Sequence, residues 1–344
     1  MTADESSFRS TAPWHNLFLR AQLLVRLRAF FQQRGFIEVE TPLLSADTVV
    51  DCHLDPFAVT AYSDPTKPHV GSTYWLQTSP EFGMKRLLAD WIVDADRHCS
   101  LPSSLAIFQV TKAFRAAEVG SQHNPEFTMV EWYKQNESYQ DAMQFLSQLA
   151  EQLLSLGPAQ LTSYRKAFQN ALGIADVHAA SIAELQQAAS QRKLDIPESL
   201  RTADKDSWLN LLMAMVVEPT LGRTAPTILF DYPASQAALA QLHNDESGTT
   251  VAARFELYVQ GIELANGYFE LLDPEELERR NHTANQIRQS EGRFTLPARS
   301  RLIDAMRSGL PSCSGVALGF DRIVMIAAGA SKIDQVIPFP WHRA

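Results

Sequence analysis

Apolar residues recur along this chain at two spacings, and the change between them outlines its elements. Residues 15–34 carry leucines and phenylalanines at helical spacing, with Gly35 as a terminator. The same spacing over residues 139–156 predicts an amphipathic helix. Short runs rich in β-branched and aromatic residues predict strands instead, namely LAIFQV, TMVEWY, TILFDYP, ARFELYVQ and GIELANGYFEL.

Turn-forming and polar residues separate these runs. Pro42 ends the short strand FIEVETP, residues 61–73 form a loop or hairpin tip, and Pro80 opens a short helix in PEFGMKRLLAD. Asp273 precedes Pro274 and predicts a capped surface helix over PEELERRNHTANQIRQ. The segment SGVALGFDRIVMIAAGA predicts a strand that runs into an apolar helix.

Strands and helices do not alternate regularly, and the later strands follow one another closely enough for antiparallel pairing. The pattern predicts an α+β fold, a mainly antiparallel sheet flanked by helices. We expect residues 1–344 to form a single domain with a mainly helical insertion at about 139–218.

The composition limits the kinds of partner that the protein could bind. The 344 residues are 45% hydrophobic and 20% charged, which is ordinary for a globular protein, and no apolar run is long enough to span a membrane. Three distant cysteines, Cys52, Cys99 and Cys313, show no metal-ligand spacing and fit small core residues of a cytoplasmic protein. The 30 Lys and Arg against 39 Asp and Glu argue against a stable grip on a nucleic-acid backbone such as that of tRNA.

The richest chemistry lies in FRAAEVGSQHNPEFTMVEWY, residues 114–133, where two strands flank a polar loop. Arg115 precedes the loop and Phe127 follows it, a pair suited to clamp a nucleotide by its phosphate and its base. A solvated hairpin is the alternative. The segment SGVALGFDRIVM adds Arg322 in the first turn of an apolar helix, where tight strand-on-helix packing is the alternative.

Carboxylates form the second group of candidates. In GIELANGYFEL, Glu263 and Glu270 are seven positions apart, so strict alternation would place them on opposite faces. A bulge at Asn266-Gly267 would restore both to one face, and a two-residue hairpin there would set them opposite each other. Elsewhere, Glu81 lies in the first turn of a predicted helix. A carboxylate there interacts favourably with the helix dipole, so a role in stability is the alternative to a role in binding.

Together these segments resemble the class II aminoacyl-tRNA synthetases. GFIEVETP resembles their motif 1, FRAAE with HNPEF their motif 2 and GVALGFDR their motif 3, in order and over nearly the whole chain. TSPE, HNPEFTMVEWY and ELANGYFEL are similar to the lysyl-tRNA synthetase subgroup, although Tyr268 stands where that subgroup commonly has Phe. The resemblance implies an ATP-dependent enzyme that uses Mg²⁺, a homodimer built on motif 1, and a strand running through GIELANGYFEL, which favours the bulge.

Departures from the family refine the expectation. Motif 1 begins near Gly35, which leaves too little chain for an anticodon-binding barrel, and Ala317 replaces the middle glycine of motif 3. The chain thus resembles stand-alone lysyl-tRNA synthetase paralogues, which implies adenylation of (R)-β-lysine or lysine and transfer to a lysine ε-amino group of elongation factor P. A minimal lysyl-tRNA synthetase is one alternative. A non-catalytic regulatory paralogue is the other, favoured only by Ala117, where the family has Glu.

The resemblance also implies roles for individual residues. Arg115 would contact the α-phosphate, His123 and Arg322 the distal phosphates, and Phe127 the adenine, with Arg115 and Arg322 catalytic. Glu263 and Glu270 would hold Mg²⁺, and we expect them to line one cavity with both arginines. The implied ATP set is Arg115, Ala116, Ala117, Glu118, His123, Asn124, Phe127, Glu263, Leu264, Gly319 and Arg322. The implied lysine or β-lysine set is Ser79, Pro80, Glu81, Glu131, Tyr133, Asn266, Glu270 and Ala317.

Overall fold

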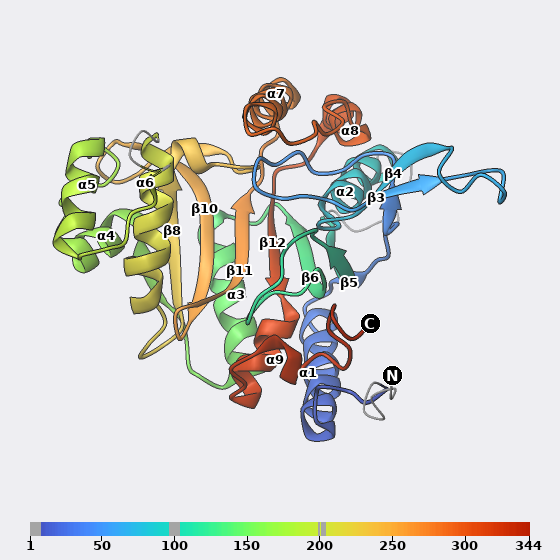
Figure 1. Ribbon diagram of the computed structural model, residues 1–344, viewed down its shortest axis with the longest axis horizontal. Coiled ribbons are helices and arrows are strands. Elements are labelled where there is room, and N and C mark those ends of the chain that lie inside the picture. The colour runs from blue at the N-terminus through green and yellow to red at the C-terminus, as the bar shows by residue number, and fades with distance from the viewer. Residues whose placement is uncertain (1–7, 96–103, 199, 201–203) are drawn as a thin grey trace. The chain divides into compact units, whose positions relative to one another are not determined.

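A computed structural model describes residues 8–95, 104–198, 200 and 204–344 (Figure 1). The chain folds into two compact units, the first made of Met1–Glu137 with Leu271–Ala344 and the second of Ser138–Glu270. Each unit contains mostly antiparallel strands flanked by helices, so the expected α+β class is confirmed. Cys52 is half-buried and Cys313 buried, both as free thiols, and Cys99 lies outside the described residues.

The strands of the first unit form two groups. β1 (Ile37–Glu38) runs parallel to β5 (Ala106–Phe114), and β6 (Glu126–Gln135) and β12 (Cys313–Gly319) continue the sheet with antiparallel pairing. A separate small sheet contains β2 (Leu44–Ser45), β4 (Ser72–Leu76) and β3 (Ala58–Ala61). The segment 61–73 is therefore a hairpin tip, one of the two forms expected for it.

The first unit contains helices both where the sequence predicts them, at residues 14–32, 81–95, 274–290 and 320–328, and where it does not, at 301–309 and 333–335. They are α1 (Trp14–Gln32), α2 (Glu81–Ala95), α7 (Pro274–Ser290), α8 (Arg301–Gly309), α9 (Phe320–Ala328) and the short 3₁₀ helix η5 (Ile333–Gln335). The Asp273 side chain accepts hydrogen bonds from the first backbone amides of α7, as expected. Phe31 of α1 stacks on Phe108 of β5 with ring centroids 4.4 Å apart, so α1 seals one face of this sheet.

The strands of the second unit pair in the order β11-β10-β8-β7, with β9 paired to β10. Its strands are β7 (Gln160–Ser163), β8 (Thr227–Pro233), β9 (Leu242–Asn244), β10 (Thr250–Val259) and β11 (Ile262–Phe269). All pairings are antiparallel except that of β7 with β8. The strands expected from TILFDYP, ARFELYVQ and GIELANGYFEL are all present.

Helices dominate the rest of the second unit. They are α3 (Tyr139–Leu154), α4 (Tyr164–Leu172), α5 (Ile182–Gln191), α6 (Lys205–Leu212), the π-helix η2 (Met213–Val217) and the 3₁₀ helices η3 (Glu218–Thr220) and η4 (Ala234–Gln236). Figure 1 shows α4, α5 and α6 grouped beside β8. Buried Tyr164, Trp208 and Tyr232 belong to the core that these helices share with β8.

None of the helices among the described residues has the length and apolar character needed to cross a bilayer.

Candidate functional site

One face of the first unit's sheet carries six of the predicted site residues. In register, Gln109 of β5 lies opposite Glu131 of β6, which lies opposite Ala317 of β12. Directly opposed residues of antiparallel strands point to the same face, and every second residue returns to it. The predicted residues on this face are Arg115, Phe127, Glu131, Tyr133, Ala317 and Gly319.

Arg115 is held over the ring of Phe127. Its guanidinium carbon lies 5.0 Å from the ring centroid, and its Nη1 is 3.9 Å from a carboxylate oxygen of Glu118. Within the part of the chain that the structure describes, the buried Nε of Arg115 has no hydrogen-bond partner. Because a buried unsatisfied donor is costly, this arrangement favours an acceptor-rich, anionic ligand at Arg115.

The loop tip meets the first turn of α9. Gly120 and His123 form an isolated antiparallel bridge that closes the tip. Arg322 donates from Nη2 to Nε2 of His123 at 2.7 Å, so this nitrogen is unprotonated. Partial burial, and then the Arg322 charge, lower the pKa of His123 from its ordinary 6.5. The structure thus brings together the two residues expected at the distal phosphates, whose role remains a prediction.

Backbone conformation explains how the loop is built around Ala117. Ala117 has a φ of +64°, in the left-handed region that residues other than glycine seldom adopt. This reversal turns the chain so that the carboxylate of Glu118 reaches Arg115. The nearest acid after position 117 is thus an ion-pair partner of Arg115, and whether it takes the place of the family glutamate stays open.

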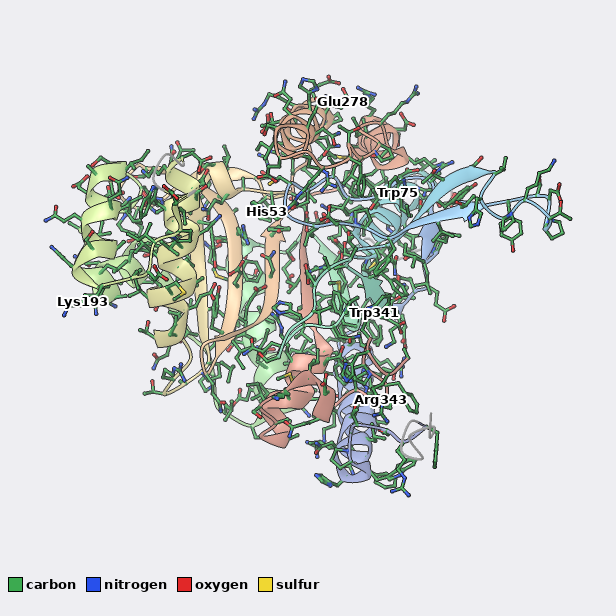
Figure 2. All side chains as sticks on the ribbon, in the orientation of Figure 1. His53, Trp75, Lys193, Glu278, Trp341 and Arg343 are labelled. Atoms are coloured by element: carbon green, nitrogen blue, oxygen red, sulfur yellow. The ribbon has the colours of Figure 1, made fainter. Side chains whose placement is uncertain are left out.

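Asn124 ties the loop to a distant part of the same unit. Its Nδ2 donates to the carbonyl of Glu126 at 2.6 Å, and its Oδ1 accepts from the backbone amide of Trp341 at 2.8 Å. Trp341, labelled in Figure 2, belongs to the C-terminal segment. These two bonds order the loop around Asn124.

A buried lysine lies among the candidates for the amino-acid pocket. Ser79 and Pro80 lead into α2, whose first residue is Glu81, and Lys85 donates to Oε1 of Glu81 at 2.5 Å. Lys85 is 1% exposed and lies 5.9 Å from the ring centroid of Tyr133. The sequence reasoning missed Lys85, although its i,i+4 spacing from Glu81 was a usable signal.

Tyr133 and Glu131 are joined to each other. The Tyr133 hydroxyl donates to Oε1 of Glu131 at 2.6 Å, and both side chains are buried. Strand alternation alone places these two residues, which are two apart on β6, on one face, and the hydrogen bond between them agrees with it.

In the second unit, β11 carries the expected bulge at a different position. Leu257 of β10 pairs with Ala265, but the next residue, Tyr258, pairs with Glu263, so Leu264 is the extra residue. The strand continues through Asn266, so the two-residue hairpin considered there is wrong. The bulge expected at Asn266-Gly267 is also wrong in position, since it lies two residues earlier.

The bulge at Leu264 brings Glu263 to the same face as Asn266, which follows it. Glu263 faces Tyr258 and Asn266 faces Glu256 in register, so Glu263 and Asn266 share one face of the strand. Alternation from Asn266 through Tyr268 continues to Glu270 on that face. The two carboxylates of GIELANGYFEL therefore lie on one face, as expected.

Gly267 has a packing role instead of a turn role. A Cβ built on Gly267 would lie 2.6 Å from Cε2 of the Phe255 ring on the neighbouring strand. Only glycine allows this ring to lie against the backbone of β11. The Asn-Gly pair thus reads as a turn signal in the sequence but serves close strand packing in the fold.

The sequence reasoning also missed a polar network on the face of the sheet that carries Glu263 and Asn266. Arg254 donates to Glu256 at 2.5 Å, and the hydroxyls of Tyr258, at 2.5 Å, and Tyr232 donate to the other oxygen of that carboxylate. Burial and the nearby Glu256 charge raise the pKa of both tyrosines, which keeps them neutral donors. The signal was present in the sequence as two charges, Arg254 and Glu256, inside an otherwise apolar strand.

Similar known proteins identify the family of this chain. A match to the tRNA synthetases of class II (D, K and N) spans residues 6–343. The chain belongs to the class II tRNA synthetase family. It is 42% identical over 343 residues to a protein of Yersinia enterocolitica, a match that covers 99% of this chain and all of the relative. A Salmonella arizonae protein is 41% identical over the same shares. Both relatives are named elongation factor P–(R)-β-lysine ligase.

Membership in the class II synthetase family implies the use of ATP. Among the residues implied to bind ATP, Arg115 lies over the ring of Phe127 and has a buried donor, Nε, without a hydrogen-bond partner in the described part of the chain. Arg322 is paired with a neutral His123. These residues fit a polyphosphate nucleotide.

The described residues do not form a metal site made of protein ligands alone. No group of three or more His, Cys, Asp or Glu side chains among the described residues is arranged to hold a metal ion. Mg²⁺ in nucleotide sites commonly takes only one or two carboxylates and completes its shell with phosphates and water. Glu263 and Glu270 as its ligands, and their sharing of a cavity with Arg115 and Arg322, remain predictions.

Proposed function

We propose that this chain is an AMP-forming ligase that activates (R)-β-lysine, or lysine, and transfers it to a lysine ε-amino group of elongation factor P. The observation that carries the nucleotide half is the buried Nε of Arg115 above Phe127. The proposed substrate and acceptor rest on full-length relatives that bear the ligase name.

The first step needs positioning more than covalent catalysis. A carboxylate oxygen of the amino acid attacks the α-phosphorus of ATP, an acyl–phosphate bond forms, and the bond to pyrophosphate breaks. Arg115 would offset charge on the α-phosphate, and Arg322 with neutral His123 would hold the distal phosphates. Mg²⁺, held by Glu263 and Glu270, would supply further positive charge to the phosphates.

Acidic side chains suit a substrate with two ammonium groups. Glu81 carries Lys85 on one oxygen, and Glu131 carries the Tyr133 hydroxyl on one oxygen. These bonds fix both carboxylates in place, so that each presents a defined direction to an ammonium donor. Ala317, opposite Glu131, adds a methyl group where the family has glycine and narrows the pocket toward one lysine isomer.

The second step forms an amide. The deprotonated ε-amine of the acceptor lysine attacks the acyl carbon of the adenylate, the carbon–phosphate oxygen bond breaks, and AMP leaves. A protein acceptor fits a chain with 39 acidic and 30 basic residues better than tRNA does. The free Cys52 and Cys313 thiols fit the reducing cytoplasm in which such an acceptor is made.

A homodimer is part of the proposal. On α1, the apolar side chains Trp14, Phe18 and Val25 are 72%, 64% and 69% exposed. Beside the motif 1 residues Glu40 and Pro42 lies an open cavity of about 500 Å³, also lined by α2 and α8. Exposed apolar surface of this kind is typical of subunit contacts. Trp14→Asp should shift the sedimentation of the protein toward a monomer.

The decisive experiment measures the mass of purified elongation factor P after incubation with this protein, ATP, Mg²⁺ and each lysine isomer. Addition of one lysyl or β-lysyl residue supports the proposal. Charging of tRNA at rates typical of a synthetase would favour the minimal synthetase instead. ATP binding without pyrophosphate exchange for any lysine isomer would favour the regulatory paralogue.

A further inference from the structure

Arg288 of α7 is a fully buried arginine outside the predicted sites. It is 0% exposed, and its Nη2 donates to the Asp55 carboxylate at 2.7 Å. Its Nη1 donates to the carbonyls of Asp51 and Leu54 at 3.1 and 3.0 Å. Its Nε donates to the carbonyl of Phe294, whose ring lies 5.0 Å from the guanidinium carbon. Both terminal nitrogens of the guanidinium thus hold residues 51–55.

Residues 51–55 contact the loop that carries Arg115. The carbonyl of Asp55 accepts a hydrogen bond from the backbone amide of Ala116 at 2.7 Å, one residue after Arg115. The amide of Arg115 itself donates to the carbonyl of Pro125 at 2.8 Å. The point where the loop leaves β5 is therefore fixed from two sides, by its own return and by Asp55.

Side chains from the α7 region, and not a strand ladder, hold the 51–55 segment. It contains no regular strand, and His53 marks it in Figure 2. Besides Arg288, Arg293 donates to the carbonyl of Cys52 at 2.7 Å. Because Ala117 adopts a left-handed backbone, the adjoining Ala116 depends on outside contacts to stay in place.

We propose that Arg288, acting through Asp55, is a positioning residue for Arg115 and so sets the affinity for the triphosphate. The buried ion pair fixes the Asp55 carbonyl, the carbonyl fixes Ala116, and Ala116 fixes the backbone from which Arg115 projects. The inference rests on the proposed function only for the identity of the ligand at Arg115.

Asp55→Asn tests this chain of contacts, because it removes the anion and keeps the shape and the backbone carbonyl. We expect the KM for ATP in lysine-dependent pyrophosphate exchange to rise about 5- to 10-fold, less than the direct loss of a charge-assisted hydrogen bond would cause, because Asp55 acts on Arg115 only through the backbone. The KM for the amino acid should change less than about 2-fold, and deuterium uptake at residues 114–118 should accelerate.

Asp47→Asn is the matched control. Asp47 precedes the same segment and receives hydrogen bonds from the amide and the side chain of Arg301, at 2.7 Å each. It should lower thermal stability to a similar or smaller extent and leave the KM for ATP unchanged. In a second arm, Arg288→Gln should raise the KM for ATP, and the Asp55→Asn/Arg288→Gln double variant should raise it no further.

The outcomes separate cleanly. An unchanged KM for ATP in Asp55→Asn, or an equal rise in both KM values, overturns the inference and leaves Arg288 a purely structural residue. If the wild-type protein supports no exchange with any lysine isomer, the proposed function fails by itself. The inference is then decided by calorimetric titration with ATP, where weaker binding by Asp55→Asn supports it and equal binding overturns it.

Discussion

The Tyr268 hydroxyl accepts a hydrogen bond from Nδ2 of Asn266 at 2.8 Å, two residues earlier on the same face of β11. The other end of the amide, Oδ1 of Asn266, accepts from Nε of Arg254 at 3.3 Å. The orientation of the Asn266 amide is therefore defined by partners on both sides. Arg254 is itself anchored by Glu256, so a buried ion pair stands behind this asparagine.

We predict that Tyr268→Phe weakens amino-acid binding without altering ATP binding. The substitution restores the residue commonly found in lysyl-tRNA synthetases but removes one acceptor from Asn266. Loss of a neutral hydrogen bond of about 1 kcal/mol corresponds to roughly a 5-fold rise in the amino-acid KM. Pyrophosphate exchange with lysine and (R)-β-lysine measures the effect.

A double-mutant cycle distinguishes action through Asn266 from a packing effect of the hydroxyl. Tyr268→Phe should have no further effect when Asn266 is already alanine. Additive losses would show that Tyr268 acts independently of Asn266.

Gly267→Ala should destabilise the fold, because the added methyl group would overlap the buried Phe255 ring. Overpacking of this kind commonly costs about 1–3 kcal/mol. Urea unfolding of the variant measures the loss, and Phe255→Leu in the same background should recover part of it. A turn-forming role for Gly267 would instead leave Gly267→Ala just as destabilised after Phe255→Leu.

The sequence predicted the elements well where one periodicity dominated. Helices α1, α3 and α7 and strands β5, β6, β8, β10 and β12 all occur where apolar spacing or an Asp-Pro cap indicated them. The shared face of Glu131 and Tyr133 followed from strand alternation alone. These predictions succeed because they depend on contacts that are local in the sequence.

Features that depend on a neighbouring strand were less accessible. The bulge at Leu264 and the glycine at 267 are set by the register with β10 and by the Phe255 ring, neither of which GIELANGYFEL contains. Arg288 and Asp55 lie 233 positions apart, so no spacing rule could join them. The i,i+4 spacing indicated the pairing of Lys85 with Glu81, but the burial of Lys85 had to come from the fold.

The pKa of His123 should respond to its neighbour. In the folded chain it lies below the ordinary 6.5, first through partial burial and then through Arg322. NMR titration should show this depression, and Arg322→Gln should move the pKa back toward 6.5. If the pKa of His123 in Arg322→Gln equals that in the wild type, the Arg322 guanidinium contributes nothing to the depression.

The same shift fixes the sign of a stability effect. Because the unfolded chain takes up the proton at a higher pH than the folded chain, the contribution of His123 to stability is intact above pH 6.5 and falls as the pH drops toward the lowered pKa. Protonation also removes the acceptor for Arg322. Stability measured from pH 7.5 downward should therefore decline less steeply in His123→Gln. An equal or steeper decline would contradict this sign.

Two adjacent residues of α9 should separate stability from ligand binding. Asp321 is 2% exposed, pairs with Arg20 at 2.5 Å and accepts from the amide of Thr128 at 2.7 Å. Arg322 points instead to His123. Asp321→Asn leaves a mostly buried Arg20 without its anion, which should reduce the free energy of unfolding by about 2–4 kcal/mol.

Arg322→Gln should reverse this pattern, with a change in unfolding free energy within about 0.5 kcal/mol and a large loss of ATP-dependent exchange. Urea unfolding and exchange assays on both variants test the contrast. Equal destabilisation by the two substitutions would place Arg322 in the structural core, whereas a stable Asp321→Asn protein would mean that the Arg20 pair contributes little. The expected contrast follows from helix geometry, because consecutive residues at the start of α9 point about 100° apart and so reach different partners.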